Sequence, residues 1–210
     1  MKFTSITRKI IMSLLGLFLV VFLTVHLGVN LLLLSSDPDL FNTASHFMAT
    51  NPVIQVMQYV LALGFILHIV FGIILWLQNN AARPKGYVKN NAGANSSLES
   101  RTMIYTGALI LLFLIIHMRN FFVVIKFGEV PPGGDYVLVT ELFGIWYYTM
   151  LYVVAFILLG LHLNHGFQSA FQSVGLNNKT WTPVWKIIGT FYSVIIAGGF
   201  SLIALYHFFV

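Results

Sequence analysis

The sequence predicts an all-α integral membrane protein with five transmembrane helices, and three observations lead to this prediction. The chain has 210 residues, of which 58% are hydrophobic and 8% are charged, whereas a soluble domain carries roughly 25% charged residues. Its mean hydropathy is +0.87. Five apolar runs divide the chain, and each supplies the roughly 20 helical residues that cross a hydrocarbon core. We expect a single domain over residues 1–210.

The predicted spans follow one another with polar connections between them. Their bounds are residues 10–34, 53–78, 102–126, 146–170 and 184–209. Asn51 precedes Pro52, and Thr182 precedes Pro183. Each pair predicts a helix start, with an N-cap followed by proline at the first helical position. We expect one more short helix over residues 40–48, lying at the outer membrane surface.

Charge alternates from loop to loop. The N-terminus and the loops after the second and fourth spans carry Lys2, Arg8, Lys9, Arg83, Lys85, Lys89, Arg101, Lys179 and Lys186. The other two loops carry Asp37, Asp39, Glu129, Asp135 and Glu141. The positive-inside rule then predicts a cytoplasmic N-terminus and an outer C-terminus. With the net charge of +5 placed between apolar spans, the expected partner of the basic residues is membrane lipid, not nucleic acid.

Histidine is the residue type that points to a function. Five of the seven histidines fall within spans: His26, His68, His117, His162 and His165. An ionisable side chain in hydrocarbon costs on the order of 2–3 kcal/mol or more when charged, so it needs a partner. The spans contain almost no carboxylate to provide one. A metal or haem iron is therefore the expected partner of several neutral imidazoles. The chain has no cysteine, which excludes disulfides, thiolate-bound clusters and covalent c-type haem.

Four of these histidines sort into two layers. His26 and His117 lie toward the outer ends of the first and third spans, and His68 and His162 lie toward the cytoplasmic ends of the second and fourth. A b-type haem takes two imidazoles from facing helices, and the core of a four-helix bundle is a suitable cavity. The first four helices are therefore predicted to form a haem-binding bundle with two b haems roughly 10 Å apart. The plainer interpretation is that each histidine is hydrogen-bonded to a neighbouring helix.

Other residues are weaker candidates. Glycine near a haem ligand leaves room for a flat macrocycle, although it is also common in transmembrane packing; the glycines concerned are Gly28, Gly72 and Gly166. Arg119 follows His117 by two residues and is a candidate partner for a propionate of the outer haem. Arg8 and Arg101, with Lys9 and Lys186, are candidates for the inner haem, with positive-inside anchoring as the alternative. Three residues are candidates for quinone binding at the outer side: Asn42, His46 and Glu141.

The histidine motifs also carry a family resemblance. They read His26-Leu-Gly-Val-Asn30, His68-Ile-Val-Phe-Gly72, His117 and His162-Leu-Asn-His-Gly166, after an opening Ser5-Ile-Thr-Arg-Lys9. In this order and spacing, the chain resembles the cytochrome b membrane-anchor subunit of succinate dehydrogenase and fumarate reductase, in the single-subunit, five-helix, dihaem class. The resemblance covers essentially the whole chain.

The resemblance implies a function and a set of partners. It implies the haem pairs His26–His117 (outer) and His68–His162 (inner), with His162 favoured over His165 because the fourth ligand stands four residues before a glycine. It also implies a bacterial cytoplasmic membrane, a flavoprotein and an iron–sulfur subunit on the cytoplasmic face, and electron transfer between the latter and a quinone, with menaquinone expected. The succinate or fumarate chemistry belongs to the partner. Some of these relatives carry a glutamate two residues before the fourth ligand, as part of a proton path, where this chain has Gly160.

Two other functions fit the same pattern. One is a cytochrome b of another respiratory complex, such as a hydrogenase or formate dehydrogenase. The other is a haem-free transporter or structural membrane protein, which would usually carry intramembrane carboxylates or broken helices.

Overall fold

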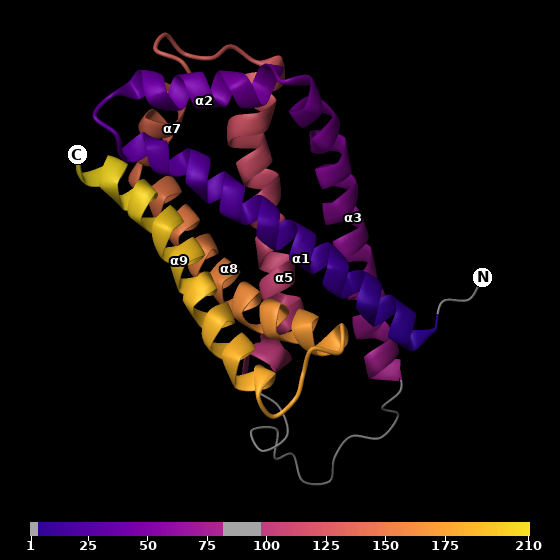
Figure 1. Ribbon diagram of the computed structural model, residues 1–210. Helices are drawn as coiled ribbons and strands as arrows, with labels where there is room; N and C mark the ends of the chain where they lie inside the picture. The colour runs from indigo at the N-terminus through magenta and orange to yellow at the C-terminus, as the bar shows by residue number, and fades with distance from the viewer. Residues whose placement is uncertain (1–3, 82–97) are drawn as a thin grey trace.

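The computed structural model describes residues 4–81 and 98–210, and these form helices joined by short loops (Figure 1). Five helices are long and apolar enough to cross a membrane: Ile6–Leu34, Pro52–Ala81, Arg101–Phe127, Trp146–Ser173 and Trp181–Phe209. Each contains the span predicted from sequence. Four of the basic residues used to predict the orientation lie outside the described residues: Lys2, Arg83, Lys85 and Lys89.

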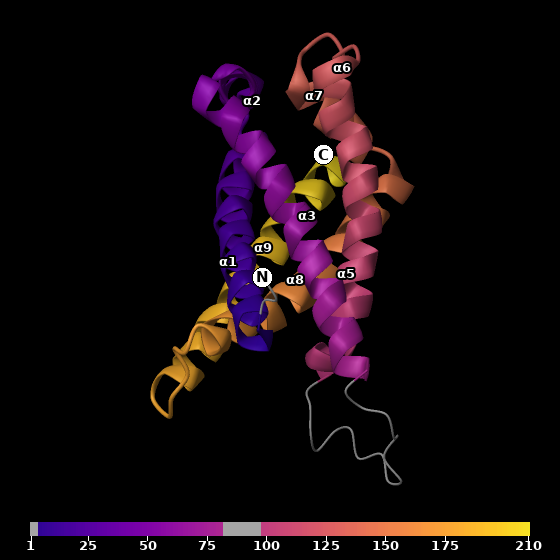
Figure 2. The same ribbon diagram turned by 90° about the vertical axis from the view of Figure 1, so that its right-hand side faces the viewer.

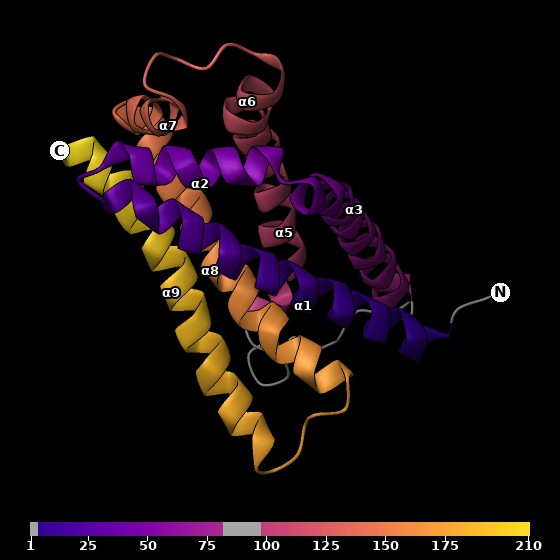
Figure 3. The same ribbon diagram turned by 45° about the horizontal axis from the view of Figure 1, so that its top comes forward.

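The first span ends where the sequence turns polar. Helix α1 (Ser5–Asn30) tightens into a 3₁₀ turn over Leu31–Leu34, as is common at the ends of helices. Helix α2 (Pro38–Thr50) then begins with the Asp37 carboxylate accepting a hydrogen bond from the Asp39 amide at 3.0 Å. The short helix predicted over residues 40–48 is therefore confirmed. It lies across one end of the bundle (Figures 1 and 3).

One of the two predicted helix starts is right and the other is wrong. Helix α3 (Pro52–Ala81) begins at its proline, and Asn51 Oδ1 accepts from the Val53 amide at 3.0 Å. Helix α9 (Trp181–Phe209) begins two residues before Pro183. Its first amide is satisfied by Asn178 Oδ1, which accepts from Trp181 N at 2.8 Å. Pro183 is tolerated inside the first turn because an amide there has no helical partner to lose.

The third span is not a uniform helix. Helix α5 (Leu98–His117) passes into a π-helical turn at Met118–Val123 and ends as α6 (Val124–Phe127). A short helix that was not predicted, α7 (Asp135–Phe143), precedes α8 (Trp146–Ser173). The loop before α7 turns at Gly133 and Gly134, whose φ values are +101° and +82°. The left-handed region is open to glycine at little steric cost.

We call the end of the bundle that carries α2 and α7 the upper end, as it stands in Figure 1, and the opposite end the lower end. Helices α1, α5 and α9 begin at the lower end, and α3 and α8 begin at the upper end (Figures 1 and 2). The upper end is the one predicted to lie outside the cell.

Packing is uneven around the bundle. Helices α8 and α9 pack along most of their length, and they provide most of the buried core, including Tyr152, Ile196 and Ala204. Helices α3 and α5 meet each other at few positions, although they run side by side in Figure 2. In the described chain, α3 contributes only Gly64 and α5 only Thr106 to the buried residues. The bundle is thus closed on its α8–α9 side and loosely packed on its α3–α5 side.

Candidate histidine pairs within the bundle

The four histidines selected from the sequence meet in the two predicted pairs. The rings of His26 on α1 and His117 on α5 have centroids 5.9 Å apart, and we call them the upper pair. The rings of His68 on α3 and His162 on α8 have centroids 6.4 Å apart, and we call them the lower pair. Each pair joins two helices, and together the pairs use the first four spans. The fifth span, α9, contributes no member.

The upper pair lies among aromatic rings. Phe22 stacks on His26 at 5.3 Å, and Phe200 of α9 lies 5.5 Å from the same ring. Three rings surround His117 at 5.3–6.1 Å: Phe113, Phe121 and Tyr152. These come from α1, α5, α8 and α9 and from the π-helical turn, so aromatic rings from four of the five spans border this pair.

The π-helical turn begins at the residue after His117. It contains Asn120, whose amide nitrogen donates to the Tyr152 hydroxyl at 3.2 Å. Tyr152 is 1% exposed. Single π turns are frequently found at functional sites, and the additional residue changes the direction of the side chains that follow. Here the turn brings a polar side chain of the third span to the buried hydroxyl of the fourth, directly beside the upper pair.

The lower pair has a polar neighbour instead of an aromatic wall. Thr106 Oγ1 donates to the Met103 carbonyl at 3.0 Å and lies 3.3 Å from His162 Nδ1. Since the hydroxyl proton points to the carbonyl, the Thr106 oxygen is left to accept from His162 Nδ1–H. This arrangement suits the tautomer of His162 that is protonated on Nδ1. In that tautomer Nε2 carries the lone pair that binds a metal.

Glycines of α1 and α5 stand beside the lower pair. A Cβ atom added at Gly16 would lie 3.7 Å from His68 Cε1, and one added at Gly107 would lie 3.4 Å from His162 Cε1. The three glycines proposed from the sequence lie elsewhere. Those at 72 and 166 face the methionines Met12 and Met103, and the one at 28 has nothing within 4 Å.

Both pairs contain an imidazole nitrogen without a partner. Among the described residues, His68 Nδ1 and His117 Nδ1 are buried with no hydrogen bond. A buried donor or acceptor left in this state costs on the order of 1–3 kcal/mol. Such atoms are expected where a group outside the polypeptide completes the site.

The number of metal-binding side chains in each pair limits the kind of metal centre that the pair could bind. The described residues form no group of three or more His, Cys, Asp or Glu side chains able to hold a metal ion. Each pair therefore offers two imidazoles. Two protein ligands suit an iron whose remaining four positions are filled by a macrocycle, as in a b-type haem. With nitrogen–metal bonds of about 2 Å and about 1.2 Å from nitrogen to ring centre, the centroids of two opposed imidazoles lie about 6.4 Å apart. The lower pair, at 6.4 Å, has this spacing, and the upper pair, at 5.9 Å, is slightly closer.

The predicted partners of haem propionates take different positions. Arg119 is exposed on the π-helical turn near the upper pair. Arg8 is half-buried in the first turns of α1, and Arg101 is exposed near the start of α5, so both lie at the lower end. The fifth histidine of the spans, His165, is half-buried on α8, three residues beyond His162. The structure thus puts one arginine near the upper pair and two at the lower end.

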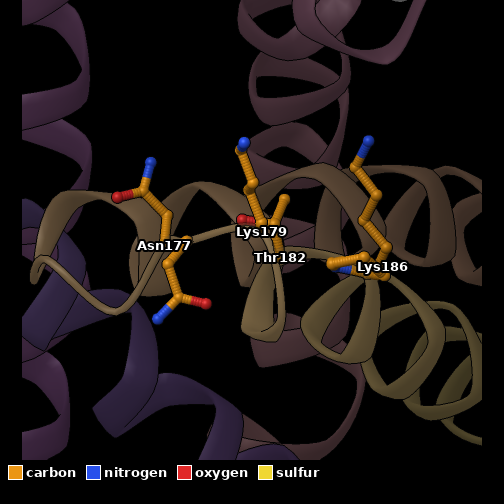
Figure 4. A pocket seen from close by; sticks show the side chains of 6 residues that line it. Asn177, Lys179, Thr182 and Lys186 are labelled. Atoms are coloured by element: carbon orange, nitrogen blue, oxygen red, sulfur yellow. The ribbon is translucent and has the colours of Figure 1, made fainter.

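Two surface pockets of about 540 Å³ each lie at opposite ends of the bundle. The upper one includes Asn42 and His46, while Glu141 is exposed on α7 outside its lining. Asn42 is engaged in structure, since it donates to the Gly133 carbonyl and accepts from the Tyr136 amide. The lower pocket lies at the start of α9 (Figure 4), where the side chains of Lys179 and Lys186 extend in the same direction. This arrangement agrees with basic anchoring of the lower end.

The packing of α8 against α9 explains why residue 160 is a glycine. A Cβ atom at this position would lie 2.9 Å from Ala197 Cβ of α9, which is closer than side chains normally approach. The helices α8 and α9 meet here through their backbones, as small residues allow in membranes. A glutamate at position 160 would require α9 to move away.

Sequence reasoning missed several neighbours of the pairs. The contact of Thr106 with His162 depends on how helices α5 and α8 pack together, and no local sequence motif indicates it. The spacing from Gly16 to His26 and from Gly107 to His117 is the same, ten residues. This repeat on α1 and α5 is readable in the sequence. It indicates that each of these helices places a glycine beside one pair and a histidine in the other.

Comparison with known proteins gives no match for this chain, among family models, curated proteins or solved structures.

Proposed function

We propose that this protein is a membrane cytochrome b that holds two b-type haems, one between His26 and His117 and one between His68 and His162. The observation that carries the proposal is the pairing itself. Four histidines from four successive spans meet two by two, with ring centroids 5.9 and 6.4 Å apart. Two opposed ligands of one iron lie at about this separation, and each pair includes one histidine from the loosely packed α3–α5 side.

The residues of the chain have separate parts in such a site. The imidazoles would provide the axial ligands, and Thr106 would hold His162 in the tautomer that presents Nε2. The aromatic rings around the upper pair would exclude water and lower the local polarity. Bound haem supplies one-electron transfer, and two haems at different depths provide a path for electrons across the bilayer.

We further propose that the protein is the membrane anchor of a succinate dehydrogenase or fumarate reductase complex, in the bacterial cytoplasmic membrane with its N-terminus in the cytoplasm. The motif resemblance and the basic lower end support this. Arg8, Arg101, Lys179 and Lys186 would face the soluble flavoprotein and iron–sulfur subunits. Electrons would pass between the iron–sulfur subunit and a quinone, expected to be menaquinone, which exchanges two electrons and two protons per molecule.

The first test is the haem content of the detergent-purified complex, measured as pyridine haemochrome. Wild-type protein should contain two haems b per chain. Alanine at position 26, 68, 117 or 162 should remove one haem or leave it with an altered spectrum, and His165→Ala should retain both. Properly inserted wild-type protein without haem would contradict the proposal. The pairs would then be edge-to-face ring contacts within a haem-free membrane protein.

A second measurement tests the complex. Purification in mild detergent should recover a flavoprotein and an iron–sulfur protein that together oxidise succinate or reduce fumarate. Recovery of hydrogenase or formate dehydrogenase subunits would assign the same cytochrome to another respiratory complex.

A further inference from the structure

Helices α1 and α5 each place a glycine beside the lower pair. Gly16 of α1 lies beside His68, and Gly107 of α5 lies beside His162. In both cases the atom approached is Cε1, the ring carbon between the two nitrogens. No side chain therefore separates the backbone of α1 or α5 from the edge of an imidazole that would bind the metal.

Helix packing does not explain these two glycines. At Gly64, Gly160, Gly189 and Gly199 an added Cβ atom would come within 2.8–2.9 Å of a neighbouring side chain, so any larger residue forces movement. At Gly16 and Gly107 the nearest atom would be 3.7 and 3.4 Å away, which is ordinary contact. The described chain has room for alanine at both positions. Alanine also favours a helix interior more than glycine does.

We propose that Gly16 and Gly107 keep the edges of the lower haem site clear, and so act as positioning residues for the macrocycle between His68 and His162. This inference rests on the proposed function. A haem is wider than an imidazole, and its plane extends beyond Cε1 whichever ring nitrogen binds the iron. A methyl group in contact with Cε1 would border the space that a bound macrocycle needs, although the polypeptide alone has room for it.

The effect is confined to the lower pair. The walls of the upper pair are aromatic side chains, and Gly16 and Gly107 precede its ligands by ten residues, or about 15 Å along each helix. The glycine and the histidine are ten residues apart on both helices, so α1 and α5 have the same arrangement. Each of α1 and α5 supplies clearance at the lower level and a ligand at the upper level.

The experiment compares Gly16→Ala and Gly107→Ala with the control Gly198→Ala in the full-length chain. At Gly198 an added Cβ atom meets nothing within 4 Å, and the residue lies on α9. Haem content and the midpoint potential of each haem are measured by pyridine haemochrome and redox titration. The control should keep two haems with wild-type potentials. Each test variant should lose the lower haem, bringing the content toward one per chain, or shift the potential of that haem alone.

The background variant His26→Ala identifies which haem responds. In that background only the lower haem should remain, and adding Gly16→Ala should remove it or shift its potential. Two haems with wild-type spectra and potentials in both alanine variants would overturn the inference. Failure of both variants to insert would also overturn it, since the glycines would then serve packing. Wild-type protein without haem would contradict the proposed function itself, which is a different result.

Discussion

The two histidine pairs consist of the same side chains in different surroundings. The upper pair is enclosed by phenylalanine and tyrosine rings and lies beside a π-helical turn. The lower pair is bordered by two glycines and a threonine hydroxyl. The bundle therefore surrounds its two histidine pairs in two different ways. Side-chain bulk shapes the upper site, and close backbone approach with one hydrogen bond shapes the lower site.

The largest effect is expected from removing an aromatic wall of the upper pair. Phe200 is 7% exposed and contacts both His26 and Phe156. Phe200→Ala should lower the free energy of unfolding by about 3 kcal/mol or more, because it leaves a cavity in the dense core. Unfolding in mixed detergent micelles, followed by circular dichroism, measures this.

Phe191 provides the matched control on the same helix. It is 66% exposed, so Phe191→Ala should change the free energy of unfolding by less than about 0.5 kcal/mol. Equal losses for the two variants would show that the aromatic wall is not the more tightly packed region.

The second prediction concerns the backbone contact behind the lower pair. Gly160 lies two residues before His162 and meets Ala197 of α9. Gly160→Ala should destabilise the protein by about 1–3 kcal/mol, because the added methyl group has no space. Gly198→Ala, on the facing helix but without a neighbour, should be neutral or stabilising. If both variants unfold alike, helices α8 and α9 are further apart than the structure has them.

The structure shows which features a sequence can reveal. The five spans were predictable because hydropathy alone selects helices of sufficient length. The histidine layers were predictable because helix rise converts residue numbers into depth. The start of α9 was not predictable in the same way. Its N-cap is Thr180, and its first amide is bound by Asn178 from the preceding loop, a contact that depends on the path of that loop.

The missed features arise from contacts between helices. The π-helical turn at Met118–Val123 is a change of hydrogen-bond register, and its sequence carries no pattern that distinguishes it from an ordinary helical turn. Helix α7 is short and follows a proline–glycine loop, so its length gave no signal. The hydrogen bonds of Thr106 and Asn120 likewise exist only once helices α5 and α8 are packed together.

The third prediction tests the polar contact of the lower pair. Thr106→Val keeps the shape of the side chain and removes the oxygen that accepts from His162 Nδ1. We expect a loss of about 1–2 kcal/mol in stability, because a buried N–H loses an acceptor, and a shift in the potential of the lower haem. Redox titration measures the shift. Thr106→Ser retains the hydroxyl and should restore the wild-type potential, whereas equal potentials in all three proteins would exclude a role for this bond.

The smallest effect is expected at the hydrogen bond beside the upper pair. Tyr152→Phe removes the hydroxyl that accepts from Asn120 and should cost about 1 kcal/mol of stability. Asn120→Ala and the double variant complete a mutant cycle, which isolates the energy of the pair. A coupling energy near zero would mean that the bond contributes nothing.

The substitutions at Asn120 and Thr106 should also affect different haems. Asn120 lies on the π-helical turn that follows His117, so loosening it should change the orientation of that imidazole. The potential or spectrum of the upper haem should therefore move, and that of the lower haem should stay the same. Thr106→Val should have the opposite pattern. Two substitutions of similar energetic size that act on different haems would show that the bundle sets its two sites independently, since neither the aromatic walls nor the glycine borders are shared between them.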